Sequence, residues 1–155
     1  MIDDALGAFL EGPVMMVAAA RGLDGRAAIA RGLGARRNAA DGVEMFVSRW
    51  QWPEALAGLA PGDAVAMTFC RPTDYSAYQV KGDLIGVGPA ADEDVRVAEG
   101  YLREVSAILV GLGVQPRQIA CWLTLRDLVR LTVRPRVAFL QTPGPTAGAA
   151  VAAPA

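Results

Sequence analysis

The chain has 155 residues, of which 53% are hydrophobic and 20% charged, so it can bury the core of one domain. Its formal net charge of −1 provides no overall positive field for a polyanion, which argues against nucleic-acid binding. The absence of histidine removes the usual general base and the commonest zinc ligand, so we expect no metal centre and any chemistry to belong to a bound cofactor.

The apolar segments of the sequence show the pattern of neither a membrane span nor a signal peptide. No run reaches the roughly 18–20 apolar residues of a membrane span, and the first residues lack the basic and apolar parts of a signal peptide. Cys70 and Cys121 are too few for a disulfide framework and read as buried reduced thiols. We therefore expect a cytoplasmic protein with no membrane partner.

The first part of the chain predicts one helix followed by strands. Residues 3–11 have helical apolar spacing after Asp3, a possible N-cap, and the helix ends at Gly12-Pro13. Strands are expected over residues 14–20, 26–33, 43–48 and 64–70, with turns at 23–25 and 38–42. Pro53 in a first turn predicts a short helix between the last two of these strands.

The second part of the chain predicts two more strands and a long helix. Residues 76–88 and 127–140 are expected as strands, the latter bent at Pro135. Residues 92–112 predict the long helix, and residues 116–123 predict a short one. The inward-facing stripe of the long helix is expected to consist of Val95, Leu102, Val105, Leu109 and Leu112. Residues 92–94 are acidic and read as capping residues of that helix.

The order of these elements predicts a mainly β (α+β) fold. Short strands linked by hairpins must close or be covered to protect their edges, which favours a small antiparallel barrel with helices outside. We expect one domain over residues 1–142. Residues 143–155 are rich in Ala, Pro and Gly and carry no charge, so they predict a flexible tail.

Lys81 is the single lysine beside fourteen arginines, and it lies in the 76–88 strand. Strand alternation places Gln79 and Lys81 on the same face, where an ammonium and an amide suit a phosphate or an electron-rich ring atom. Gly82 would permit close approach of a backbone. The alternative is a solvated lysine on an edge strand.

Two other segments carry candidate binding groups. Arg31 lies within a strand, where it must face water or an anionic partner, and the nearby Gly32 and Gly34 either relieve crowding against a ligand or mark a bulge. Residues 48–52, SRWQW, leave a strand and enter a helix, so free amides, a hydroxyl and a guanidinium predict an anion pocket. The tryptophans could flank a flat ring or anchor the helix.

Four segments together resemble the pyridoxamine 5′-phosphate oxidase-like, FMN-binding split-barrel superfamily over roughly residues 5–146. Residues 134–141, RPRVAFLQ, are similar to the closing strand of the family, which typically reads P-x-R-V-E-F-W-Q. Residues 25–31 (GRAAIAR), 46–49 (FVSR) and 79–82 (QVKG) are similar to its second strand, the strand before its phosphate-binding turn and its central strand.

The resemblance implies a six-stranded antiparallel split β-barrel with flanking helices, present as a homodimer that binds FMN between its subunits. It implies an FMN-dependent oxidoreductase acting on a small-molecule substrate, with Gln141 reaching the ring from the partner subunit; no catalytic residue is assigned. The expected cofactor-binding residues are Arg31, Ser48, Arg49, Gln51, Trp52, Gln79, Lys81 and Gln141.

Departures from the family pattern argue against one of the family's reactions. Leu140 stands where the authentic oxidases carry Trp, and their Arg-Leu-His-Asp-Arg segment has no counterpart after Gln141, so we do not expect pyridoxamine phosphate oxidation. Two alternatives stay open: a non-catalytic module that stores a flavin, haem or another planar cofactor, and a cofactor-free dimeric barrel. Haem ranks behind FMN because the chain offers no histidine ligand.

Overall fold

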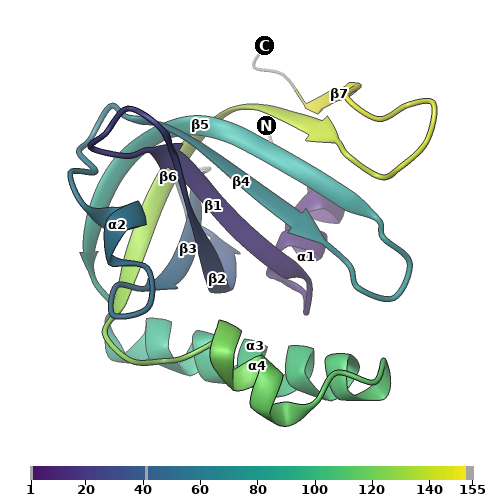
Figure 1. The fold of residues 1–155 in the computed structure, drawn as a ribbon. Helices are drawn as coiled ribbons and strands as arrows, with labels where there is room; N and C mark the ends of the chain where they lie inside the picture. Colours follow the sequence, from purple (N-terminus) through teal and green to yellow (C-terminus); the bar gives the residue numbers. More distant parts are fainter. Residues whose placement is uncertain (1, 41, 153–155) are drawn as a thin grey trace.

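A computed structural model describes residues 2–40 and 42–152, beginning with a short helix at one end of a barrel (Figure 1). Helix α1 spans Asp4–Glu11, and the Asp3 side chain caps it by accepting a hydrogen bond of 2.8 Å from the Leu6 backbone N–H. Leu6 and Leu10 are buried against the barrel. The predicted N-terminal helix and its cap are therefore confirmed.

Six antiparallel strands close into a barrel, as expected from the sequence. Around the barrel the strand order is β3-β2-β1-β4-β5-β6, and the additional pairing of β3 with β6 joins the two ends. Val43 of β3 lies opposite Val133 of β6, and Ser48 opposite Leu128. The strands are β1 (Met15–Arg21), β2 (Ala27–Arg37), β3 (Val43–Ser48), β4 (Ala64–Cys70), β5 (Ala77–Pro89) and β6 (Leu128–Leu140).

The barrel interior is filled by side chains from alternate strand positions. Met67 and Phe69 of β4 and Val80 of β5 have no exposed surface, and the intervening residues of these strands point outward. β3 is buried at every position, which matches its almost continuous apolar sequence. The interior is thus a packed core.

Two glycines of the expected binding segments serve the barrel itself. The register of β2 shifts between Gly32 and Ala35, where Gly34 has a φ of +108°, so this segment is a β-bulge. At Gly82 a Cβ atom would collide with the carbonyl oxygen of Arg134 on β6. Gly82 therefore allows the close approach of the β6 backbone.

Three further helices lie outside the barrel: α2 (Pro53–Leu56), α3 (Asp92–Gly111) and α4 (Pro116–Trp122). α3 and α4 lie side by side at one end of it (Figure 1), and α3 packs against β2. The buried face of α3 passes through Ala98, Tyr101, Val105 and Leu109, whereas Leu112, expected in that stripe, is 53% exposed. The buried stripe therefore passes through Tyr101 instead of Leu102, and the Tyr101 hydroxyl donates a 2.9 Å hydrogen bond to the Val14 carbonyl in the core. Burial raises the pKa of the Tyr101 phenol.

Asp94 fastens the start of α3 to the barrel. Its carboxylate has no exposed surface and accepts hydrogen bonds from Arg36 (2.7 Å), Arg130 (2.9 Å) and the Ala91 backbone N–H (2.8 Å). Arg36 also pairs with Glu44 at 2.7 Å. The expected capping role is present, but the same carboxylate also joins α3 to β2 and β6.

The segment after β6 folds back onto it. β7 (Ala150–Ala152) pairs with Ala138 and Phe139 of β6, and the Gly148 backbone N–H donates to the Leu140 carbonyl at 2.7 Å. The composition of this segment does not predict a strand, because Ala, Gly and Pro favour none; its mobility stays a prediction, as does the domain boundary at residue 142. Within the described residues, no helix has both the length and the hydropathy needed to cross a bilayer.

We predict that Asp94→Ala lowers the free energy of unfolding by about 2–3 kcal/mol in urea denaturation. This is below the roughly 3–5 kcal/mol for breaking a fully buried ion pair, because Arg36 and Arg130 keep part of their hydration. The matched control is Glu93→Ala, since Glu93 lies 3.5 Å from Arg36 but its side chain is 72% exposed. Equal losses in the two variants would contradict the role of Asp94.

Candidate functional site

One row of residues across the outer face of the barrel brings together two of the expected binding groups. Arg31 of β2 lies opposite Val17 of β1, Val17 opposite Thr68 of β4, and Thr68 opposite Gln79 of β5. The Gln79 amide donates a 3.0 Å hydrogen bond to the Thr68 hydroxyl. Arg31 and Gln79 therefore lie on the same exposed face, three strand spacings or about 14 Å apart at their backbones.

The neighbouring row adds Lys81 to this face. Lys81 is exposed, and its Nζ atom lies 5.2 Å from the centroid of the Phe139 ring. Small side chains, among them Ala19 and Ala66, leave a hollow of about 640 Å³ that Lys81 and Val137 also line. We call this region the outer sheet face: the outward side chains of β2, β1, β4, β5 and β6 around these two rows.

Arg31 and Lys81 carry charges that no carboxylate of the described chain neutralises within 4.0 Å. Arg31 instead lies over the Trp122 ring at 5.2 Å. By contrast Arg136, on the same side of the barrel, is paired with Asp83 at 2.6 Å. The outer sheet face thus presents Arg31 and Lys81 as cations without a carboxylate partner in the described chain, and Arg21 of β1, which also lines the hollow, is a third.

Ser48 lies at the end of β3 and is fully buried. Its hydroxyl donates a 2.6 Å hydrogen bond to the Arg126 carbonyl and accepts one of 3.2 Å from the Gln51 backbone N–H. The bond from Gln51 closes the turn between β3 and α2, and the bond to Arg126 joins this turn to the segment before β6. The hydroxyl expected to bind a cofactor is therefore engaged within the protein.

Arg49 is likewise engaged, by Asp127. Its Nε and Nη2 atoms donate to the two carboxylate oxygens at 3.0 and 2.9 Å, and this hydrogen bonding holds the pKa of Asp127 below its usual range. The carboxylate occupies the position where the sequence predicts a ligand anion. α2 has only four residues, so its N-terminus adds little field. The anion pocket expected at this turn is filled by the chain itself.

Gln51 and Trp52 line a cleft of about 930 Å³ between the β1–β2 turn and the start of α2. The Gln51 Nε2 atom donates a 2.6 Å hydrogen bond to the Cys121 carbonyl at the end of α4. The Gln51 Oε1 and Trp52 Nε1 atoms are buried, and neither finds a hydrogen-bond partner among the described residues. An unpaired buried polar group lowers the stability of the fold by about 1–3 kcal/mol, so each of these two atoms is unfavourable unless it gains a hydrogen-bond partner.

The cleft and the outer sheet face are adjacent. Ala27 of β2 lines both the cleft and the hollow beside Lys81, and Ile29, 55% exposed, also lines the cleft. Arg31 is two residues beyond Ile29 on the same face, about 7 Å along the strand. Seven of the eight expected residues thus lie on this face or at the adjoining turn, although the chain itself engages the Ser48 and Arg49 side chains fully and the Gln51 and Gln79 amides in part.

Gln141 is the exception. It follows β6, where its backbone N–H donates to the Ala77 carbonyl at 2.7 Å, and it lines neither the cleft nor the hollow. Its expected contact with a ring held by a partner subunit stays a prediction.

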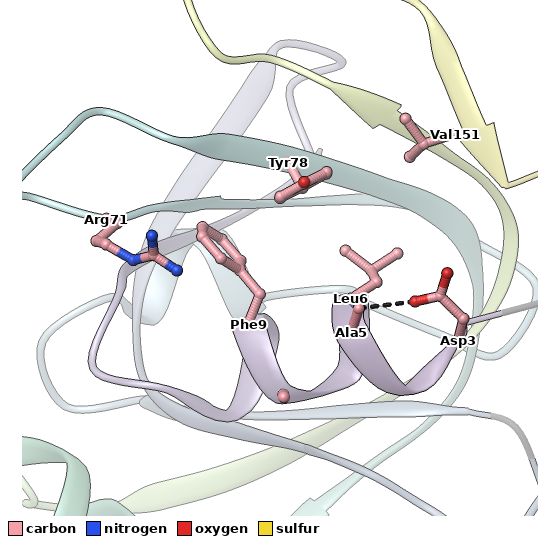
Figure 2. Close-up of a pocket in the computed structure, with 8 residues that line it drawn as sticks. Asp3, Ala5, Leu6, Phe9, Arg71, Tyr78 and Val151 are labelled. Carbon is pink, nitrogen blue, oxygen red and sulfur yellow. Dashed lines mark hydrogen bonds between the residues drawn. The ribbon is translucent and has the colours of Figure 1, made fainter.

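A separate hollow of about 440 Å³ lies between α1 and the barrel (Figure 2). Phe9 packs edge-on against Tyr78 with ring centroids 4.9 Å apart, and Arg71 lies over Phe9 at 4.9 Å. Arg71 is already paired with Asp74 at 3.0 Å. This hollow contains none of the residues expected to bind a cofactor.

Trp122 and Ile29 belong to the site but are not found by sequence reasoning. Residues 116–123 are correctly predicted as a helix, but nothing in their spacing shows that the helix ends over Arg31. Ile29 reads as an ordinary apolar strand residue. Only the packing of α4 against the barrel and the depth of the cleft reveal their positions.

Comparison with known proteins gives relatives only at the level of structure. No protein-family model and no curated protein matches the sequence. An F420 reductase structure aligns with 84% of this chain and 93% of its own at 17% identity, with a TM-score of 0.53. HupZ from Group A Streptococcus aligns with 96% of this chain and 100% of its own at 12% identity, with a TM-score of 0.52.

Both matches cover most of this chain. At these identities they bear on the fold alone. Together with the closure of six antiparallel strands through β3 and β6, they confirm the barrel expected from the sequence. The chain has the fold of a six-stranded antiparallel split barrel with flanking helices.

Proposed function

We propose that this protein binds a flavin, FMN in the first place, on the outer sheet face and uses it in the oxidation or reduction of a small molecule. The observation that carries the proposal is that Arg31, Lys81 and Arg21 have no carboxylate partner in the described chain and lie on a face whose hollow is lined mostly by Ala, Gly and Val side chains. A phosphate can pair with the cation at one end of the face, and a flat ring fits over the Ala, Gly and Val side chains of the hollow.

The spacing of Arg31 and Lys81 favours an elongated ligand. Arg31 and Lys81 lie on β2 and β5, roughly 15 Å apart at their backbones. A small anion held by one of them leaves the other unpaired. A phosphate-bearing ring system is long enough to lie along the face between them, with Gln79 offering an amide beside Lys81.

The same face is proposed to bind a second copy of the chain. Ile29 is 55% exposed, and the hollow beside Lys81 is bordered by Ala and Val side chains, so the face is apolar between its cations. A twofold pairing would place this face against itself and enclose the ligand between two subunits. Enclosure raises the strength of each charge interaction because water is excluded.

The outer sheet face offers both the charges and the hydrogen-bonding groups that a flavin needs. Cations are available for a phosphate, and Gln79, which donates through its Nε2 atom to Thr68, keeps its side-chain carbonyl oxygen for the polar edge of a ring. When bound, a flavin supplies hydride and single-electron chemistry, and the chain itself supplies binding, orientation and exclusion of water. The F420 reductase among the structural matches supports a redox role by analogy of fold.

We predict that the purified protein, supplied with FMN, retains a visible flavin spectrum that bleaches with dithionite. Reduction of the bound flavin by NADH or NADPH would support an oxidoreductase over a storage role. An unchanged protein spectrum after FMN and desalting, or a Soret band that FMN does not displace, would contradict the proposal.

We predict that Arg31→Ala and Lys81→Ala each weaken FMN binding by about 5- to 150-fold, the usual loss for one charge-assisted contact. The matched control is Arg136→Ala, which removes a cation beside Lys81 that Asp83 already neutralises. Fluorescence titration gives the dissociation constants, and circular dichroism checks the fold. Equal, small effects in all three variants would remove the two cations from the site.

A further inference from the structure

The hollow between α1 and the barrel has charges of opposite sign at its two ends (Figure 2). Asp3, just before α1, lies at one end, and Arg71, the first residue after β4, lies at the other. Apolar side chains, Phe9 among them, form the floor between them, and Tyr78 of β5 packs against Phe9. The hollow is therefore polar at both ends and apolar in the middle.

The polar groups of the hollow have hydrogen-bonding capacity that the described chain does not use. Asp3 accepts from the Leu6 backbone N–H through Oδ1, which leaves Oδ2. Arg71 donates to Asp74 through Nη1, which leaves the donors on Nε and Nη2. The Tyr78 hydroxyl forms no hydrogen bond with the other residues drawn in Figure 2. A ligand here can gain an acceptor at one end, donors at the other and a hydroxyl between them.

The turn between β4 and β5 holds Arg71 in place. The Arg71 backbone N–H donates to the Ser76 carbonyl at 2.8 Å, and its carbonyl accepts from the Tyr75 N–H at 2.9 Å. Tyr75 has a φ of +60°, which a bulky side chain seldom adopts, so this turn is maintained at a cost in backbone strain. The guanidinium is also restrained by its 3.0 Å ion pair with Asp74. A restrained side chain loses less conformational entropy when a ligand binds.

The charges and their spacing select the class of ligand. Asp3 and Asp74 outnumber Arg71, so an anion such as the phosphate of FMN is disfavoured here. A simple amine would pair with Asp3 and leave Arg71 unused. Asp3 lies six positions before Phe9, about 9 Å along the axis of α1, and Arg71 lies over the Phe9 ring. An extended dipeptide, about 7 Å long, carries an ammonium and a carboxylate at a comparable separation.

We propose that this hollow binds a free dipeptide with apolar side chains. The ammonium pairs with Asp3, the carboxylate pairs with Arg71, and the peptide group lies beside the Tyr78 hydroxyl. The apolar side chains pack on Phe9 and on Val151 of β7, which lines the same hollow and is 47% exposed. The hollow shares no lining residue with the cleft or with the hollow beside Lys81, so the proposal is independent of flavin binding.

The first experiment alters the ligand and leaves the protein unchanged. Calorimetric titration compares leucyl-leucine with N-acetyl-leucyl-leucine, which lacks the ammonium, and with leucyl-leucinamide, which lacks the carboxylate. We expect leucyl-leucine to bind about fivefold more tightly than either, because each analogue loses one charged contact at a partly exposed site. Affinities of the three within twofold of one another, or no detectable binding of leucyl-leucine, would overturn the proposal.

The second experiment removes one charge from the hollow. Asp3→Asn keeps a good N-cap for α1 but lacks the carboxylate charge. We expect it to bind leucyl-leucine about fivefold more weakly than wild type and to lose the discrimination against N-acetyl-leucyl-leucine. Asp4→Asn is the matched control, because Asp4 is exposed, pairs with Arg37 and does not line the hollow; it should bind as wild type does. Equal losses in the two variants, or none in Asp3→Asn, would overturn the proposal.

Discussion

The pairing of β3 with β6 is the contact on which the rest of the structure depends. Without it the sheet would end in two open edges; with it, six strands enclose an interior that Phe46, Phe69 and their neighbours fill. A filled interior cannot receive a cofactor. Any ligand must therefore bind on the outside of the barrel or between the barrel and its helices, which is where the free polar groups are found.

The polar groups of the chain fall into two sets with different roles. Ser48, Arg49 and Asp94 are engaged by other residues of the chain, and they hold turns and helices in place around the barrel. Arg31 and Lys81 have no carboxylate partner within the described residues and contact aromatic rings instead. The first set ties turns and a helix to the barrel, and the second carries the case for a ligand.

Sequence patterns predict the strands, the long helix and the barrel well, because these follow from local apolar spacing and from turn residues. They also place Arg31, Gln79 and Lys81 on outward strand positions, since strand alternation decides this. They cannot show that Asp127 would neutralise Arg49, because that pairing joins residues 78 apart in the chain. Nor can they show that Gly82 serves the neighbouring strand, because the approach of β6 depends on the register of the whole sheet.

The central claim is that the outer sheet face holds a flavin between two copies of the chain. Sedimentation velocity, followed both at the visible absorbance of FMN and at that of the protein, tests it most directly. The account predicts that FMN sediments with a species of twice the mass of the chain, at one flavin for each chain. Flavin that sediments as the free molecule, or with a monomer, would contradict it.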